Sequence, residues 1–239
     1  MTQISERTGR ESEAQTEARG GILASKSRVT VLQGCLGLVL VMFIALAALA
    51  STHARFALDL DITLAVQTIR APWFDLLMRI VSWPGYLPQA PVITIVLVLI
   101  VWWLGTEKAA FMTILTAIGV QLLNWLIKIL IQRPRPGEDL VEVYRELSTF
   151  SFPSGHVMFY TAFYGFLLYL SYRLLKNYWL RLILGLVFGG LILLVGVSRI
   201  YLGVHWPSDV LGAYIIGALS LLAAIQFYRW GRKRFFTGE

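Results

Sequence analysis

Cysteine, charged residues and histidine are all scarce in this chain. One cysteine, Cys35, occurs in 239 residues, which excludes a disulfide or a cysteine-based metal site within the chain. Charged residues make up only 15% of the sequence and 57% is hydrophobic, whereas soluble globular proteins average about 25% charged residues. Several apolar runs approach or exceed the roughly 20 residues needed to cross a bilayer. The composition therefore predicts an integral membrane protein with several spans.

The net charge of +7 does not indicate a nucleic-acid partner. The basic residues form no single stripe or arm, and most of them flank the hydrophobic runs. That placement is typical of topology signals and of contacts with anionic lipid headgroups. We therefore expect the lipid bilayer, and no nucleic acid, as the partner of this surface.

The apolar runs predict an all-α bundle of six transmembrane helices. The expected spans are residues 29–50, 89–105, 109–131, 157–174, 179–202 and 207–228. The first run is longer than the 7–15 residues (roughly) of a signal-peptide core, so we expect it to remain as an anchor. Residues 52–88 mix charged side chains with Leu, Ile and Phe, which predicts one or two amphipathic helices lying on the membrane surface.

Three parts of the chain follow from this pattern. Residues 1–28 carry five Lys or Arg and four Glu with few apolar residues, which is typical of a disordered tail. Residues 29–228 form the six-span domain, and residues 229–239 form a basic tail. Six spans place both termini on one side, and that side carries 13 of the 21 Lys and Arg. The positive-inside rule therefore predicts cytoplasmic termini in a multi-pass protein of the cell membrane.

Three polar clusters lie on the opposite, extracytoplasmic face of this topology. They are "KILIQRPRP" with Lys128 and Arg135, "PSGH" with Ser154, Gly155 and His156, and "SRIYLGVHWPSD" with Arg199, His205 and Asp209. Each cluster stands at the end or the start of an expected span, so distant segments meet at one membrane interface. We expect these side chains to form a single site.

The three cations of these clusters predict an anion-binding pocket. Lys128, Arg135 and Arg199 would repel one another by roughly 4 kcal/mol per pair at 4 Å and an effective dielectric of about 20. A dianionic phosphate between them reverses the sign of that energy. Ser154 and the backbone N–H groups around Gly155, at a helix N-terminus, add neutral donors. Because three cations oppose a divalent ion, we expect no metal at this site.

The two histidines of the clusters supply reactivity. Asp209 follows His205 by four residues, so on a helix it can accept a hydrogen bond from one ring nitrogen and leave the other free to attack. His156 comes from a different helix and has no acidic partner in its own motif. It is therefore the natural general acid for the leaving group.

Each of these residues also has a structural interpretation. Lys128 alone could snorkel from a helix end to the interface, and Arg199 alone could be an interfacial anchor. Arg133 lies beside the first cluster without a defined role, and His53 has no partner in its motif. Ser154 could be a serine nucleophile, but the chain contains no G-x-S-x-G elbow.

Together the clusters resemble the three-part signature of the type 2 phosphatidic acid phosphatase family. The parts read K-x6-R-P from residue 128, P-S-G-H from residue 153 and S-R-x5-H-x3-D from residue 198. Their order and spacing are complete, and three parts at the expected gaps are far more specific than any one of them. The match covers residues 128–209 directly, and the six-span layout extends it to most of the chain.

The resemblance implies a helical bundle that hydrolyses a lipid phosphate without a metal or other cofactor. It implies that His205 is the nucleophile and forms a phosphohistidine, that Asp209 orients it, and that His156 protonates the leaving oxygen. It implies a set of groups that hold the phosphoryl oxygens: Lys128, Arg135, Ser154, Gly155 and Arg199. The substrate class would be phosphatidylglycerophosphate, phosphatidate or an isoprenyl diphosphate such as undecaprenyl diphosphate. An intramembrane serine protease and a non-catalytic lipid-phosphate binder or transporter remain as alternatives.

Overall fold

The computed structural model describes residues 30–31 and 33–235, and every regular element in that part of the chain is helical. The expected tail at residues 1–28 and the last residues of the basic tail, 236–239, lie outside the described residues. The chain divides into two units, Met1–Met42 and Phe43–Glu239. The described part of the first unit is helical, and the helix Gln33–Thr52 continues into the second.

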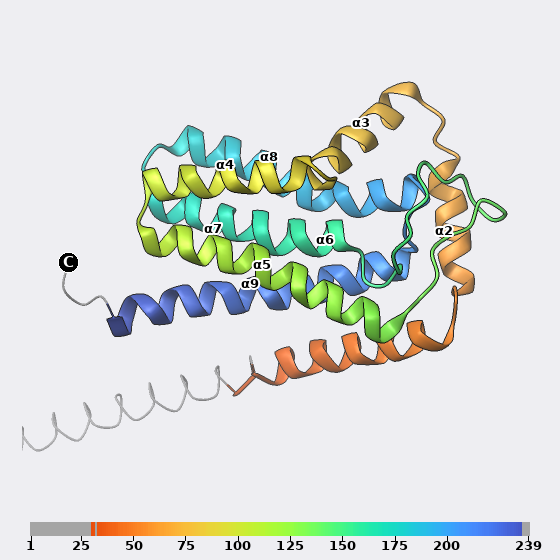
Figure 1. Cartoon of the computed structure of the whole chain (residues 1–239), viewed down its shortest axis with the longest axis horizontal. Coiled ribbons are helices and arrows are strands. Elements are labelled where there is room, and N and C mark those ends of the chain that lie inside the picture. Colours follow the sequence, from red (N-terminus) through yellow and green to blue (C-terminus); the bar gives the residue numbers. More distant parts are fainter. Residues whose placement is uncertain (1–29, 32, 236–239) are drawn as a thin grey trace, which may run out of the picture. The chain divides into compact units, whose positions relative to one another are not determined.

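The second unit contains the following elements (Figure 1): α2 (Ala57–Gln67), α3 (Pro72–Ser82), η1 (Trp83–Gly85), α4 (Gln89–Leu104), α5 (Glu107–Ile131), α6 (Gly155–Phe159), η2 (Tyr160–Tyr164), α7 (Gly165–Leu174), α8 (Tyr178–Tyr201) and α9 (Pro207–Phe235). The ends of α4, α5 and α8 fall within two residues of the ends predicted from the apolar runs. The all-α fold is thus confirmed.

Four helices of the described chain are long and apolar enough to cross a membrane: Gln33–Thr52, Glu107–Ile131, Tyr178–Tyr201 and Pro207–Gly231. A fifth span results if Pro72–Gly85 and Gln89–Leu104, which meet at 66°, are counted as one. The expected span 157–174 forms α6, η2 and α7, each of which is too short to qualify alone. The count of six therefore stays a prediction.

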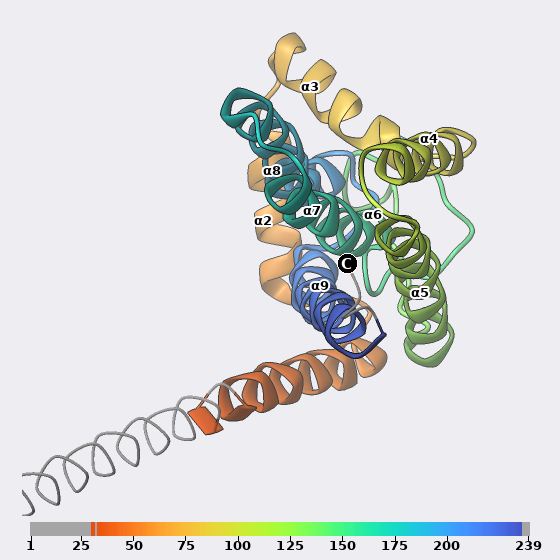
Figure 2. The same cartoon turned by 90° about the vertical axis from the view of Figure 1, so that its left-hand side faces the viewer.

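The helical run α6–η2–α7 is the centre of the second unit. Figure 2 looks along the helices and shows α7 surrounded by α5, α8 and α9. Val157, Phe163 and Phe166 are fully buried, and burying a side chain of this size stabilises a fold by roughly 1.5–3 kcal/mol. The middle of the run is a π-helical turn, η2, a feature that is frequent at functional sites.

Local sequence explains where the site-bearing helices begin and end. Thr106 caps α5 by accepting a hydrogen bond from the backbone N–H of Ala109 at 3.3 Å. At the other end of α5, Gln132 adopts the left-handed conformation with φ of 51°. Pro134 and Pro136 then prevent the helix from continuing. The chain leaves α5 in a loop, residues 132–154, that carries Arg133 and Arg135.

Within the segment 52–88, the helix α2 turns a row of polar side chains toward the protein. In α2 the residues Asp59, Thr63 and Gln67 follow one another at intervals of four, and all three are buried. The helix contacts α8 and α9, and α3 contacts α8. The prediction that residues 52–88 lie on the membrane surface is therefore not confirmed, because these polar groups are satisfied by the protein.

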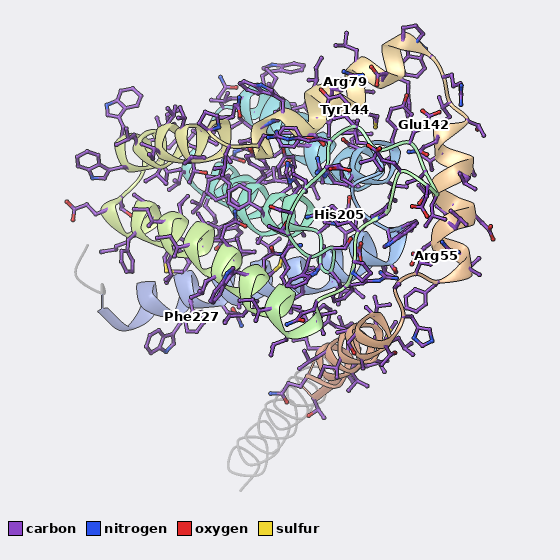
Figure 3. All side chains as sticks on the ribbon, turned by 45° about the vertical axis from the view of Figure 1, so that its right-hand side comes forward. Arg55, Arg79, Glu142, Tyr144, His205 and Phe227 are labelled. Carbon is purple, nitrogen blue, oxygen red and sulfur yellow. The ribbon has the colours of Figure 1, made fainter. Side chains whose placement is uncertain are left out.

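The loop 132–154 is fastened over one end of the helices. Gln67 of α2 donates from Nε2 to the carbonyl of Glu142 at 2.7 Å and accepts from the Glu142 N–H at 3.1 Å. The guanidinium of Arg79 on α3 lies 4.3 Å from the ring centre of Tyr144 (Figure 3). Figure 1 shows this loop and α2 at the opposite end of the helices from the last turns of α9.

Candidate active site

The three polar clusters converge on one cavity of about 200 Å³. Six of the eight site residues expected from the sequence line it: Lys128, Arg135, Gly155, His156, Arg199 and His205. They come from α5, the loop 132–154, α6, α8 and the turn before α9. Figure 3 shows His205 in the interior of the unit, far from Phe227 near the other end of α9. The predicted convergence of distant segments is therefore present.

His205 lies in the turn between α8 and α9 with both ring nitrogens near polar groups. Nη1 of Arg135 is 3.1 Å from Nε2, and since a guanidinium only donates, Nε2 must accept and the ring proton must be on Nδ1. Burial, and after it the positive charges of Arg135 and Lys128, hold the pKa of His205 well below its usual value. The ring is thus neutral at pH 7, with a lone pair on the side of Arg135.

Asp209 does not hydrogen-bond His205 directly, contrary to the expectation from their spacing. The distance from His205 Nδ1 to Asp209 Oδ2 is 3.7 Å, beyond hydrogen-bond range. The hydroxyl of Ser151 lies near both groups. It donates to Asp209 Oδ2 at 2.5 Å and is 3.4 Å from His205 Nδ1. Ser151, which the sequence pattern did not single out, therefore links the carboxylate to the imidazole.

His156 sits in an aromatic cage. Its ring centre is 5.0 Å from that of Tyr86, edge to face, and 6.2 Å from that of Tyr160. The backbone of Gly85 approaches so closely that a Cβ there would lie 2.3 Å from His156 Cδ2. Neither Gly85 nor Tyr86 was expected from the sequence, because nothing in the segment 52–88 resembles the three clusters.

Arg199 is fully buried near the end of α8. Its Nη1 donates to Ser82 Oγ at 3.0 Å and to the Tyr86 hydroxyl at 2.8 Å. Its Nε and Nη2 face no acceptor among the described residues. One edge of the guanidinium is thus fixed by the α3–α4 turn, and the rest remains available to a ligand.

Several buried polar atoms in or beside the cavity lack a hydrogen-bond partner within the described chain. They are Ser154 Oγ, His156 Nε2, Arg199 Nε and Arg199 Nη2. Each buried polar atom left unpaired costs about 1–3 kcal/mol, so such a group of atoms indicates a site built for a polar ligand. Lys128 and Arg135 add positive charge, although both also donate to backbone carbonyls of the loop. The arrangement suits a tetrahedral oxyanion.

An apolar groove of about 750 Å³ runs between α4 and α5 next to this cavity. Ala90, Gln121 and Phe159 line both the groove and the cavity. The rest of the groove wall is almost entirely aliphatic and includes Val98 and Ile114. An apolar chain in the groove would place an attached polar head at the cavity.

Comparisons with known proteins agree with this geometry. The sequence pattern of the PAP2 superfamily matches residues 108–233. Phosphatidylglycerophosphatase B of Bacillus subtilis is 33% identical over 182 residues, which cover 74% of this chain and 86% of that protein. A putative undecaprenyl-diphosphatase of Escherichia coli is 29% identical over 158 residues, covering 64% of this chain and 73% of that protein.

A solved structure has the same fold. The crystal structure of a transmembrane PAP2-type phosphatidylglycerolphosphate phosphatase from Bacillus subtilis superposes with a TM-score of 0.73 and 28% identity. The match covers 84% of this chain and 98% of that one. The resemblance drawn from the three clusters is confirmed: the chain belongs to the PAP2 superfamily and is a phosphate-ester hydrolase of that family.

Proposed function

We propose that the protein hydrolyses a lipid phosphate monoester or diphosphate through a phosphohistidine on His205, without a metal ion. One observation carries the proposal: a neutral imidazole lines a cavity next to an apolar groove, together with buried polar atoms that lack partners within the described chain. Positioning and preorganised charge supply most of the acceleration that phosphoryl transfer requires.

The reaction has two steps with complementary proton transfers. Arg135 first turns from His205 Nε2 to a phosphoryl oxygen, and Nε2 then forms a bond to phosphorus while the bond to the leaving oxygen breaks. His156 gives its proton to that oxygen. Water next attacks phosphorus, the N–P bond breaks, and His156 takes the proton from the water. Asp209, acting through Ser151, stabilises the charge that His205 acquires in the first step.

Five groups are proposed to hold the phosphoryl oxygens: Lys128, Arg135, Ser154, Gly155 and Arg199. The three cations among them match the charge of the transferring group, so no divalent ion is needed to neutralise it. Ser154 Oγ and the free edge of Arg199 are buried without partners in the described part of the chain, which supports their assignment as ligands of the phosphoryl oxygens.

The groove points to a lipid as the carrier of the phosphate. The cavity of about 200 Å³ is too small for an acyl chain together with a phosphate, whereas the groove next to it is larger and apolar. The names of the relatives support phosphatidylglycerophosphate or undecaprenyl diphosphate, and phosphatidate has the same chemistry. The positive-inside pattern supports an extracytoplasmic location for this chemistry.

The contacts of the two nearby serines weigh against a serine protease. The hydroxyl of Ser154 has no hydrogen-bond partner among the described residues, so no base there activates it. Ser151 is near His205 and Asp209 but donates its proton to the carboxylate. In a catalytic triad the serine instead donates to the imidazole, and the carboxylate holds the other ring nitrogen.

Phosphate release from a panel of these lipids in detergent micelles tests the proposal. His205→Ala should lower kcat by at least about 10²-fold on every substrate, as expected for a catalytic group, while His53→Ala, at an exposed histidine, should not. Activity should survive EDTA, and vanadate should inhibit it. A His205→Ala variant with more than a hundredth of the activity, or a requirement for added Mg²⁺ or Zn²⁺, would count against the mechanism. Binding of the lipids without turnover would favour the non-catalytic alternative.

A further inference from the structure

A buried carboxylate of α2 lies next to the active-site helix α9. Asp59 is 2% exposed and accepts hydrogen bonds from the N–H of Ser208 at 2.9 Å and from the Ser208 hydroxyl at 2.8 Å. It also accepts from the N–H of Phe56 at 3.1 Å, at the start of its own helix. Ser208 directly precedes Asp209, so Asp59 holds the first turn of α9.

A buried arginine joins this carboxylate to Asp209. Arg133 is 1% exposed, and its Nη2 donates to Asp59 Oδ2 at 2.8 Å. Its Nη1 donates to Asp209 Oδ1 at 2.6 Å and to Ser208 Oγ at 2.6 Å. The planar guanidinium thus bridges two carboxylates from helices that are 150 residues apart in sequence, a geometry that a lysine cannot reproduce.

Asp209 accepts three hydrogen bonds in this arrangement, and both of its carboxylate oxygens take part. Oδ1 faces Arg133, and Oδ2 accepts from Ser151 Oγ at 2.5 Å and from the N–H of Trp206 at 2.9 Å. The carboxylate therefore has a defined rotation about its own axis, and Oδ2 is turned toward Ser151 and His205. Loss of Arg133 or Asp59 would leave a buried charge uncompensated and free that rotation.

We propose that Asp59 and Arg133 are positioning residues for phosphoryl transfer, which act on His205 through Asp209 and Ser151. The order of contacts is Asp59 to Arg133, Arg133 to Asp209, Asp209 to Ser151, and Ser151 to His205. Two carboxylates share one guanidinium, so the network retains a negative charge behind the imidazole. That charge stabilises the cationic ring formed when Nε2 bonds phosphorus. The inference rests on the proposed role of His205.

The two proposed positioning residues lie on different sides of the boundary of the family match. Asp59 lies outside the matched residues 108–233, in a helix whose buried face had no assigned role. Arg133 lies between Lys128 and Arg135 of the first cluster but does not line the cavity. It faces away from the phosphate and toward the group that orients the nucleophile.

The test is a double-mutant cycle on kcat, measured per folded protein in detergent micelles. Asp59→Asn should lower kcat roughly 10- to 100-fold, the range found when a group that orients a functional side chain is removed, with KM changed by less than about two-fold. In an Asp209→Asn background, Asp59→Asn should lower kcat by less than about two-fold, because Asp59 acts through Asp209 and that carboxylate is already replaced. Asp61→Asn, at an exposed carboxylate of the same helix, is the matched control and should leave kcat unchanged.

A second measurement separates positioning from folding. The chain has three histidines, so ¹⁵N labelling of histidine gives a spectrum in which His205 can be assigned by substitution. Asp59→Asn and Arg133→Lys should both shift the Nδ1 resonance of His205, and Asp61→Asn should not. Thermal melting of each variant gives the folded fraction.

The outcomes are distinct. Equal losses of kcat for Asp59→Asn in both backgrounds, a loss confined to KM, or an unchanged His205 spectrum would each overturn the inference. If His205→Ala leaves activity intact, the proposed function itself fails. If His205→Ala abolishes activity while Asp59→Asn preserves kcat, only the positioning role is wrong.

Discussion

At the scale of single residues, the two active-site histidines have opposite surroundings. His205 has both nitrogens near polar groups, Arg135 on one side and Ser151 on the other. His156 is caged by aromatic rings, and its Nε2 has no partner within the described chain. A ring held at Nδ1 is oriented for attack through Nε2 once Arg135 turns to the phosphate. A ring with a free nitrogen is suited to exchanging a proton with the substrate. These surroundings support the proposed division of roles.

His156→Ala should therefore have an effect that depends on the leaving group. A glycerol alkoxide needs a proton to depart, so phosphatidate hydrolysis should fall by the roughly 10²–10⁴-fold typical of acid catalysis. A nitrophenolate, or the phosphate lost from a diphosphate, departs readily and should depend on His156 much less. The measurement is kcat/KM for both substrate types with both histidine variants.

His205→Ala is the matched control for this comparison, because attack on phosphorus is common to all substrates. It should abolish turnover of aryl phosphates and lipid phosphates alike. Equal losses for His156→Ala across leaving groups would show that His156 only positions the phosphate.

At the scale of elements, the bend between α3 and α4 forms a wall of the site. Ser82 and Tyr86 hold Arg199, and Gly85 touches the ring of His156. All three residues lie outside the matched region 108–233. The segment expected to be an amphipathic surface helix thus supplies contacts that position both Arg199, a proposed phosphate-binding residue, and His156, the proposed general acid.

Gly85→Ala should reproduce the leaving-group dependence of His156→Ala in milder form. The new Cβ would lie 2.3 Å from Cδ2 and 2.7 Å from Nε2 of His156, so the ring must turn within its cage and lose its alignment. We expect kcat on phosphatidate to fall by about 10-fold or more, by analogy with other displaced catalytic groups, with a smaller loss on an aryl phosphate. Gly119→Ala in α5, where nothing lies within 4 Å of the new atom, should leave both rates unchanged. Equal losses on the two substrates would contradict this role.

The positions of helices and of the three clusters could be predicted because their signals are local. Apolar runs set the lengths of α4, α5 and α8, and Pro134 with Pro136 marks the end of α5. The role of Arg133 could not be predicted from the sequence, because the direction of its side chain depends on the left-handed turn at Gln132. Spacing alone does not reveal that turn.

The buried face of α2 had a visible signal with an ambiguous meaning. Asp59, Thr63 and Gln67 recur every four residues, which predicts a polar stripe on a helix. In a helix on the membrane surface, such a stripe faces headgroups and water. In a helix that packs against buried hydrogen-bond donors, the stripe faces the protein and supplies the acceptors. Only the position of Arg133 and Ser208 opposite Asp59 decides between the two.

At the scale of the whole molecule, the orientation in the membrane decides which leaflet supplies the substrate. The side of the termini carries 13 of the 21 Lys and Arg, and three of the other eight, Lys128, Arg135 and Arg199, belong to the proposed site. The basic residues with no proposed role in phosphate binding therefore favour cytoplasmic termini strongly.

Single cysteines placed in the loop at residues 138–147, in a Cys35→Ser background, test this orientation. We expect them to react with a membrane-impermeant maleimide in intact cells, because the loop lies at the same end of the helices as the cavity (Figure 1). A cysteine placed at Lys108, in the first turn of α5, should react only after permeabilisation. The reverse pattern would assign the substrate to the cytoplasmic leaflet.

The groove between α4 and α5 also bears on which measure of substrate concentration sets the reaction rate. If the aliphatic groove holds the lipid chain as proposed, the substrate enters from within the lipid layer and its phosphate reaches the neighbouring polar cavity. Encounter then takes place in two dimensions, and the rate follows the mole fraction of the phosphorylated lipid among its neighbours. Adding more membrane of the same composition leaves the rate per enzyme unchanged, whereas diluting the substrate with inert lipid slows it. A cell would therefore control this reaction through the composition of one leaflet, with no change in the amount of enzyme.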